Sequence, residues 1–83
     1  MRYYVYIIRS AVKKWFYIGL TQNLEKRLLQ HNLGKVTSTK IYRPFNLIFA
    51  QIVNSRKEAR DMEIFLKVRF NKEALLDLIL PGW

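Results

Sequence analysis

The chain has 83 residues, of which 51% are hydrophobic and 14% aromatic, so residues 1–83 can bury a modest core as one domain. The absence of cysteine excludes disulfides and thiolate zinc sites and fits an intracellular, cytoplasmic setting. The formal net charge of +9 favours nucleic acid as the partner, through neutralisation of phosphates, over an anionic membrane surface or mere solubility.

The first two predicted elements are strands, at residues 3–8 and 15–20, because both segments are rich in β-branched and aromatic side chains. The first strand is also the longest apolar run, and it is far shorter than the roughly 20 residues that a membrane-spanning helix needs, so we expect no membrane partner. Gly19, near the end of the second strand, either terminates that strand or lets a phosphate backbone approach closely.

The register of the two strands decides where their tyrosines lie. If Arg9 pairs with Lys14 across a four-residue loop, the antiparallel ladder places Tyr6 directly opposite Tyr17, on the same face of the sheet. A slip of one residue would move the two phenols to opposite faces.

A helix is expected at residues 24–33, since Asn23 can cap its start and Gly34 can provide a left-handed stop. Three leucines supply its buried stripe: Leu24, Leu28 and Leu29. Arg27 and His31 are four residues apart, so they share a face of this helix, which points toward a sheet edge or groove. Taken alone, the arginine is an ordinary solvated charge, and the histidine is a satisfied surface or helix-end residue.

Residues 35–44 read as a loop, because hydroxyl and basic side chains precede a proline there. We expect three basic residues of this loop to contact nucleic acid: Lys35, Lys40 and Arg43. A third strand follows at residues 45–53, which are apolar and β-prone.

The second helix begins at Ser55, which forms a capping box with Glu58. Its predicted core stripe consists of Ala59, Met62, Leu66 and Phe70. Glu63 lies at the border of this stripe, where a carboxylate is costly to desolvate, so it is either an ion-pair partner of Lys67 or a metal ligand, the ion pair being the more common case. A last helix is expected at about residues 72–80.

The predicted order of elements, β-β-α-β-α-α, indicates an α+β fold. Its three-stranded, mostly antiparallel sheet is flanked by helices, and the third strand joins the hairpin after a helical crossover. Glu25 is the only acid before residue 58, so the first two thirds of the chain should carry a strongly positive field.

Tyrosines, an arginine, a histidine and one carboxylate are the groups that a metal-assisted phosphodiesterase needs. A single carboxylate suffices for Mg²⁺, which keeps several waters and takes other oxygens from the phosphate. A phenol is a poor base near neutral pH because its ordinary pKa is about 10. The metal, Arg27 or another nearby positive charge would have to lower that pKa, and the basic surroundings act in this direction. Strand tyrosines are more often packing residues, so composition alone leaves this hypothesis in the minority.

Four segments, in this order along the chain, resemble the GIY-YIG nuclease domain, in particular its small single-domain bacterial branch. They are Val5-Tyr6-Ile7, Tyr17-Ile18-Gly19, Asn23-Leu24-Glu25-Lys26-Arg27-Leu28 through His31, and Ser55-Arg56-Lys57-Glu58-Ala59 with Glu63 and Lys67. The resemblance runs from Tyr3 to about Leu80. It implies a domain that cleaves DNA phosphodiester bonds with one divalent metal ion, Mg²⁺ or Mn²⁺.

The resemblance also implies roles for five residues. Tyr6 and Tyr17 match the motif tyrosines, one of which is proposed to activate the attacking water. Arg27 matches the arginine that contacts the scissile phosphate, and His31 a helix residue that supports the site in some branches. Glu63 matches the metal-binding glutamate.

The chain departs from the family pattern at three positions. Tyr4 stands where the first motif has glycine, and Leu20 stands where the excision-repair relatives carry a lysine. Asn71 matches the family's polar residue beyond the glutamate only with a different spacing.

Three hypotheses fit the sequence. The leading one is a metal-dependent, structure-selective DNA endonuclease of repair or recombination, since phosphate contacts alone carry no sequence information. The second is a nucleic-acid-binding module of the same fold with weak or no catalysis. The third is an interaction subunit that forms a homodimer or takes its specificity from a partner protein.

Overall fold

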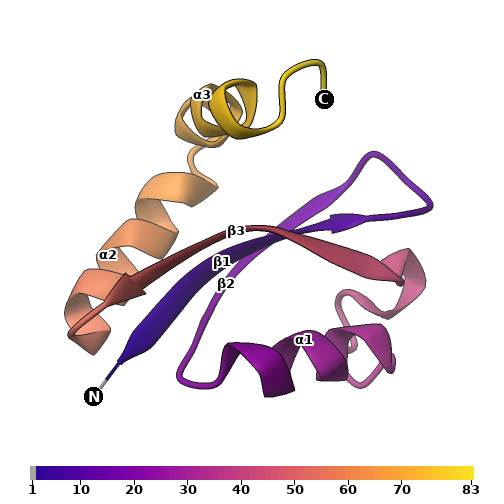
Figure 1. Cartoon of the computed structure of the whole chain (residues 1–83), viewed down its shortest axis with the longest axis horizontal. Coiled ribbons are helices and arrows are strands. Elements are labelled where there is room, and N and C mark those ends of the chain that lie inside the picture. The colour runs from indigo at the N-terminus through magenta and orange to yellow at the C-terminus, as the bar shows by residue number, and fades with distance from the viewer. Residues whose placement is uncertain (1) are drawn as a thin grey trace.

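The computed structural model describes residues 2–83, and its elements follow the expected order (Figure 1). The strands are β1 (Tyr3–Ser10), β2 (Phe16–Thr21) and β3 (Phe45–Val53). The helices are α1 (Leu24–Asn32), α2 (Arg56–Lys67) and α3 (Arg69–Ile79), with a short 3-10 helix η1 at Lys40–Tyr42. The sheet has the strand order β2-β1-β3, and both pairings are antiparallel, which confirms the α+β class and topology.

The central strand β1 is buried on both faces, which explains why it reads as a continuous apolar run. Val5 and Ile7 pack into the core beneath α2. Tyr6 and Ile8 pack into a second core, beneath α1. Figure 1 shows α1 on one side of the sheet and α2 with α3 on the other. Tyr6 therefore carries its phenol toward α1.

The predicted hairpin register is wrong by two residues. Tyr6 pairs with Gly19, and Tyr17 pairs with Ile8. The cause is a longer turn than expected, which Ser10 holds by accepting hydrogen bonds on its hydroxyl from the backbone N–H groups of Val12 and Lys13. Because a shift of two residues preserves the side-chain alternation, the two tyrosines still share the α1 face.

Helix α1 begins as predicted, since the Asn23 side chain accepts a hydrogen bond from the Lys26 N–H at 3.0 Å. Gly34 has a φ of 77°, the left-handed conformation expected just beyond the helix. The predicted buried stripe is partly wrong: Leu24 and Leu28 are half-buried, but Leu29 is exposed. One residue beyond Leu28 is a rotation of about 100°, which turns Leu29 away from the sheet.

The second predicted helix also starts at its cap, where the Ser55 hydroxyl accepts a hydrogen bond from the Glu58 N–H. Phe70 does not belong to the core stripe and is 78% exposed. The reason is a break in the helix: Val68 has extended backbone angles, so the spacing that runs to Leu66 does not continue. Helix α3 consequently begins at Arg69, three residues before the predicted start.

Within residues 2–83, no helix combines the length and the apolar character that crossing a membrane requires.

Candidate functional site

Three buried side chains, one each from β1, α1 and the loop after α1, form one hydrogen-bonded chain. The phenol oxygen of Tyr6 lies 2.9 Å from Nε2 of His31, and Nδ1 of His31 lies 2.9 Å from Oγ1 of Thr39. All three residues are at most 1% exposed. His31 lies in the last turn of α1 with both ring nitrogens hydrogen bonded, as expected of a satisfied helix-end histidine, but it is buried and not at the surface.

We assign the proton on the His31 ring from its hydrogen-bond partners. The Thr39 hydroxyl donates to the carbonyl oxygen of Val36 at 3.3 Å, so its oxygen is free to accept from His31. His31 then donates through Nδ1–H, which leaves the lone pair on Nε2 to accept the phenol proton of Tyr6. A neutral imidazole thus faces a protonated phenol.

Burial sets the protonation state of both groups. It lowers the pKa of His31 to about 4, with a further contribution from the positive charge of Arg27. It raises the pKa of Tyr6 to about 12, although hydrogen bonding with the Arg27 guanidinium acts in the opposite direction. Arg27 thus acts in the direction expected of the basic surroundings, but the pKa of Tyr6 is raised overall because the loss of solvent outweighs the nearby arginine.

Tyr17 and Arg27 complete this side of the site. The Tyr17 ring lies 5.0 Å from the His31 ring and 6.3 Å from the Tyr6 ring, measured between centroids. Arg27 is half-buried and lines a polar groove together with Lys26. The structure therefore brings four of the five candidate catalytic residues together on the α1 face.

Gly19 has a packing role in this arrangement. A Cβ atom on Gly19 would lie 2.6 Å from the phenol oxygen of Tyr6 and 3.0 Å from the Tyr17 ring. Only a residue without a side chain leaves room for the phenol at this point of the sheet. A phosphate that approaches from the α1 side meets Tyr6 before it meets the Gly19 backbone.

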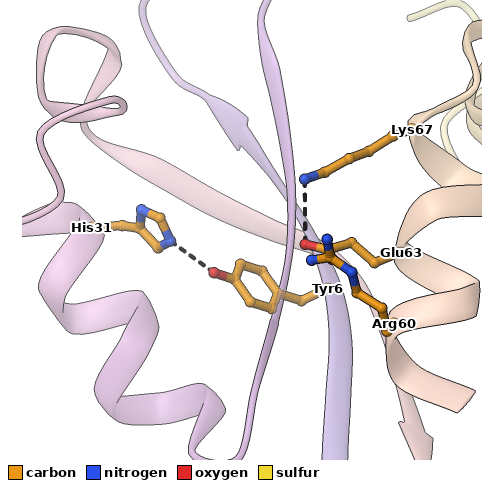
Figure 2. A network of polar contacts seen from close by, with 5 residues as sticks. All are labelled: Tyr6, His31, Arg60, Glu63 and Lys67. Carbon is orange, nitrogen blue, oxygen red and sulfur yellow. Dashed lines mark hydrogen bonds and ion pairs between the residues drawn. The ribbon is translucent and has the colours of Figure 1, made fainter. Parts of the chain in front are cut away.

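Glu63 reaches the site from α2, across the strands from His31 (Figure 2). It is only 7% exposed, and its two oxygens pair with Arg60 at 3.2 Å and with Lys67 at 3.3 Å. The predicted ion pair with Lys67 is confirmed, and Arg60 is a second partner. The carboxylate also contributes to the raised pKa of Tyr6, so the two faces are coupled electrostatically.

A metal ion would depend on Glu63. Across residues 2–83, no group of three or more His, Cys, Asp or Glu side chains could hold a metal ion. Mg²⁺ can bind through a single carboxylate when waters and substrate phosphate fill its other positions. Arg60 and Lys67 have largely exposed side chains and can move aside. The residues present thus fit an ion that arrives with a phosphate substrate better than a resident ion.

The other candidate residues lie around this site. Lys35, Lys40 and Arg43 are exposed, in the segment that also carries Thr39. Arg43 donates to the backbone oxygen of Lys40 at 3.0 Å, which orients this part of the loop. Asn71 donates to the Phe65 carbonyl at the junction of α2 and α3, so its amide supports the helix break.

Sequence reasoning missed two residues of the site. Arg60 stands three residues before Glu63, a helical spacing at which opposite charges meet, so this pair could have been found. Thr39 could not have been chosen over Thr37 or Ser38, because a loop has no periodicity that predicts which hydroxyl is buried.

Tyrosines, an arginine and a histidine on one face of a small antiparallel sheet, with a carboxylate from the other side, define the class of this domain. The family model for the GIY-YIG catalytic domain matches residues 2–75. The chain therefore belongs to the GIY-YIG family.

Individual relatives agree with this assignment. The chain is 35% identical over 78 residues to the UPF0213 protein YazA of Bacillus subtilis, an alignment that covers 90% of this chain and 78% of YazA. It is 32% identical to the UPF0213 protein SSP2268 of Staphylococcus saprophyticus, with 98% of each chain covered. The solution NMR structure of the UPF0213 protein BH0048 from Bacillus halodurans superimposes with a TM-score of 0.60 at 32% identity, covering 99% of this chain and 88% of that one.

Proposed function

We propose that this protein is a divalent-metal-dependent DNA endonuclease that hydrolyses phosphodiester bonds. The observation that carries the proposal is the hydrogen bond from Tyr6 to the neutral imidazole of His31, beside Arg27. A hydrolytic site needs a route for the proton of the attacking water, and this pair offers one.

The proton can move in two linked steps. For this transfer a water molecule must reach the phenol oxygen of Tyr6, which is buried in the free protein. The water then gives its proton to that oxygen, while Tyr6 passes its own proton to Nε2 of His31. The phenol thus need not ionise beforehand, which its pKa of about 12 would prevent. The attacking hydroxide forms a bond to phosphorus as the bond to the leaving oxygen breaks, and the leaving oxygen takes up a proton from solvent.

Substrate binding would favour this transfer. Arg27 contributes to the low pKa of His31 through its positive charge. Burial is the larger cause of the low pKa and would remain, but a DNA phosphate bound by Arg27 would offset the arginine's charge and so raise the pKa of the imidazole in part. Arg27 would also stabilise the charge that develops on the phosphate. A metal ion held by Glu63 would polarise the phosphate and water when bound.

Charge and exposure support the choice of DNA backbone as the ligand. We assign backbone contacts to the exposed cations Lys35, Lys40 and Arg43. Gly19 lies behind the phenol of Tyr6 and contributes by making room for it. Phosphate contacts position DNA but do not read its sequence. Selectivity would accordingly follow DNA structure, as in repair or recombination, and a homodimer or partner protein would supply any further specificity.

A second candidate is a DNA-binding module of the same fold without strong catalysis. The specific observation in its favour is that both oxygens of Glu63 are already paired, with Arg60 and Lys67. If these pairs hold in the presence of DNA, the carboxylate cannot receive a metal ion. The two candidates therefore differ at a single carboxylate.

Replacing that carboxylate separates them. With Mg²⁺ or Mn²⁺, the unmodified protein should cleave at least one DNA in a panel of linear, nicked, flapped and four-way substrates. Glu63→Gln keeps the volume of the side chain and should lower the rate at least about 100-fold with unchanged DNA affinity. Asp61→Asn, at an exposed carboxylate of the same helix, is the matched control and should cleave normally.

Cleavage by Glu63→Gln at the normal rate would show that Glu63 is not the metal ligand. Salt-sensitive binding without cleavage, under every metal and substrate, would establish the binding-module alternative.

A further inference from the structure

A pair of stacked aromatic rings lies beside the site and takes no part in the proton route. The rings of Trp15 and Tyr42 have centroids 3.9 Å apart and planes only 10° from parallel. Trp15 comes from the end of the hairpin turn and Tyr42 from η1. Both residues are only half-buried, so part of the stack faces solvent.

The backbone holds the two rings in place. The N–H of Ser10 donates to the carbonyl of Trp15 at 2.9 Å, and the Ser10 hydroxyl donates to the carbonyl of Tyr42 at 2.6 Å. Ser10 itself is only 3% exposed. One buried serine thus fixes both segments. Because the rings are already held in place, a flat ligand that stacks on them would cost the protein little conformational entropy.

The stack lies next to the candidate site. The Trp15 ring is 6.3 Å from the Tyr17 ring, which is in turn 5.0 Å from the His31 ring. The rings of His31, Tyr17, Trp15 and Tyr42 therefore follow one another from the proton route outward. A nucleotide beside the scissile phosphate would lie close to the Trp15 and Tyr42 rings.

The charges around the stack suit the backbone of a nucleic acid. The ammonium of Lys13 lies 5.9 Å from the centre of the Tyr42 ring. Lys13 is exposed, and so is Arg43, which follows Tyr42 in the chain. Aromatic rings that alternate with mobile cations are the arrangement by which proteins hold single-stranded nucleic acid: bases stack on the rings and cations contact phosphates.

We propose that Trp15 and Tyr42 form a stacking platform for an unpaired DNA base next to the scissile phosphate. Lys13 moves from the Tyr42 ring to the phosphate of that nucleotide when the base stacks. The proposal rests on the proposed function for its choice of DNA, but it does not require cleavage. Such a platform would explain why the protein selects DNA by structure, because only flaps, ends and other unpaired regions present a free base.

The two tryptophans of the chain allow a direct test. Trp83→Phe leaves Trp15 as the only indole. Trp15→Phe leaves Trp83, which contacts Phe16, Asp77 and the ammonium of Lys14. Phe16 packs against the core under α2, whereas Trp15 packs against the core under α1. Each variant is titrated with oligothymidylate in buffer with EDTA, so that no DNA is cut. A second titration uses an abasic oligonucleotide with the same number of phosphates, and both affinities are also measured for the unmodified protein.

The platform predicts that oligothymidylate quenches Trp15 and leaves Trp83 nearly unchanged. It also predicts at least about 5-fold tighter binding of oligothymidylate than of the abasic strand, a preference that Trp15→Leu removes. Equal affinities for the two strands, or quenching of Trp83 alone, would overturn the platform and leave Trp15 as a packing residue. Because no metal is present, these results are independent of whether the protein cleaves DNA.

Discussion

The two parts of the chain use their charges differently. Residues 2–55, which form the sheet and α1, carry nine lysines and arginines but only Glu25 as an acid, and their buried polar chain is neutral. Residues 56–83 carry six basic and five acidic side chains. All four ion pairs found in residues 2–83 lie within α2 and α3.

This difference in charge places the groups that would bind DNA and the group that would bind metal in different parts of the chain. The cations of the first part are available for phosphate, because almost no acid competes for them. The single candidate metal ligand, Glu63, lies in the second part, where it is already paired with cations. DNA affinity should therefore depend on the first part, and metal-dependent steps on the second.

The largest expected effect comes from the half-buried arginine of the first part. Arg27→Ala should slow cleavage by about 100-fold to 1,000-fold, the usual cost of removing one group that stabilises transition-state charge. Its exposed neighbour provides the control, since Lys26→Ala removes the same charge but should change the rate only slightly. Arg27→Ala should also raise the pKa of His31, which NMR of this single histidine measures directly.

If Lys26→Ala and Arg27→Ala slowed cleavage equally, general positive charge rather than a specific phosphate contact would explain both. An unchanged pKa of His31 in Arg27→Ala would remove the proposed link between substrate binding and the imidazole.

A smaller effect is expected from pH. His31 has a pKa of about 4 in the folded protein and about 6.5 when unfolded, so between these values the unfolded state binds the extra proton. The free energy of unfolding should consequently fall as the pH falls from about 6.5 to about 4, by up to about 3 kcal/mol. Urea unfolding across this range, compared with His31→Gln, isolates the contribution of the imidazole from that of the six carboxyl groups.

Titration of the imidazole near pH 6.5 in the folded protein would contradict both the burial and the neutral state of His31. Residues 2–55 would then have a charged imidazole in their polar cluster, and so would no longer differ from residues 56–83 by having a neutral one.

The sequence predicted the elements, their order and the shared face of the two tyrosines, but not the contacts between strands. Side-chain alternation is local, so Tyr6 and Tyr17 could be placed on one face even though their pairing was off by two residues. The pairing of β1 with β2 depends on the length of the turn between them. Ser10 sets that length through hydrogen bonds that the residue pattern does not predict.

The same limit applies to the second part. A capping serine predicts where α2 starts, because the cap is a local interaction. The end of α2 is set by the extended backbone of Val68, which ordinary helical spacing did not reveal, and so Phe70 was wrongly assigned to the core. In the site, helical spacing predicted that Arg27 and His31 share a face. Thr39, the hydrogen-bond partner of His31 Nδ1, lies in a loop and was not predicted.

The smallest expected effect concerns that partner. Thr39→Val keeps the shape of the side chain but leaves the buried Nδ1–H of His31 without an acceptor, which should lower the free energy of unfolding by about 1–3 kcal/mol. Thr37→Val, at an exposed position of the same loop, should change it by less than about 0.5 kcal/mol. Thr39→Ser retains the hydroxyl and should restore most of the loss.

Nitrogen NMR of His31 decides whether Thr39 positions the proton or merely fills space. In the unmodified protein Nδ1 should carry the proton, whereas Thr39→Val should shift the population toward the Nε2–H form. That form donates to Tyr6 instead of accepting from it, so cleavage should slow even under conditions in which the variant is fully folded. If Thr39→Val lost the same stability but kept the same tautomer, Thr39 would be only a packing residue. The hydrogen-bonded route for the proton would then consist of Tyr6 and His31 alone.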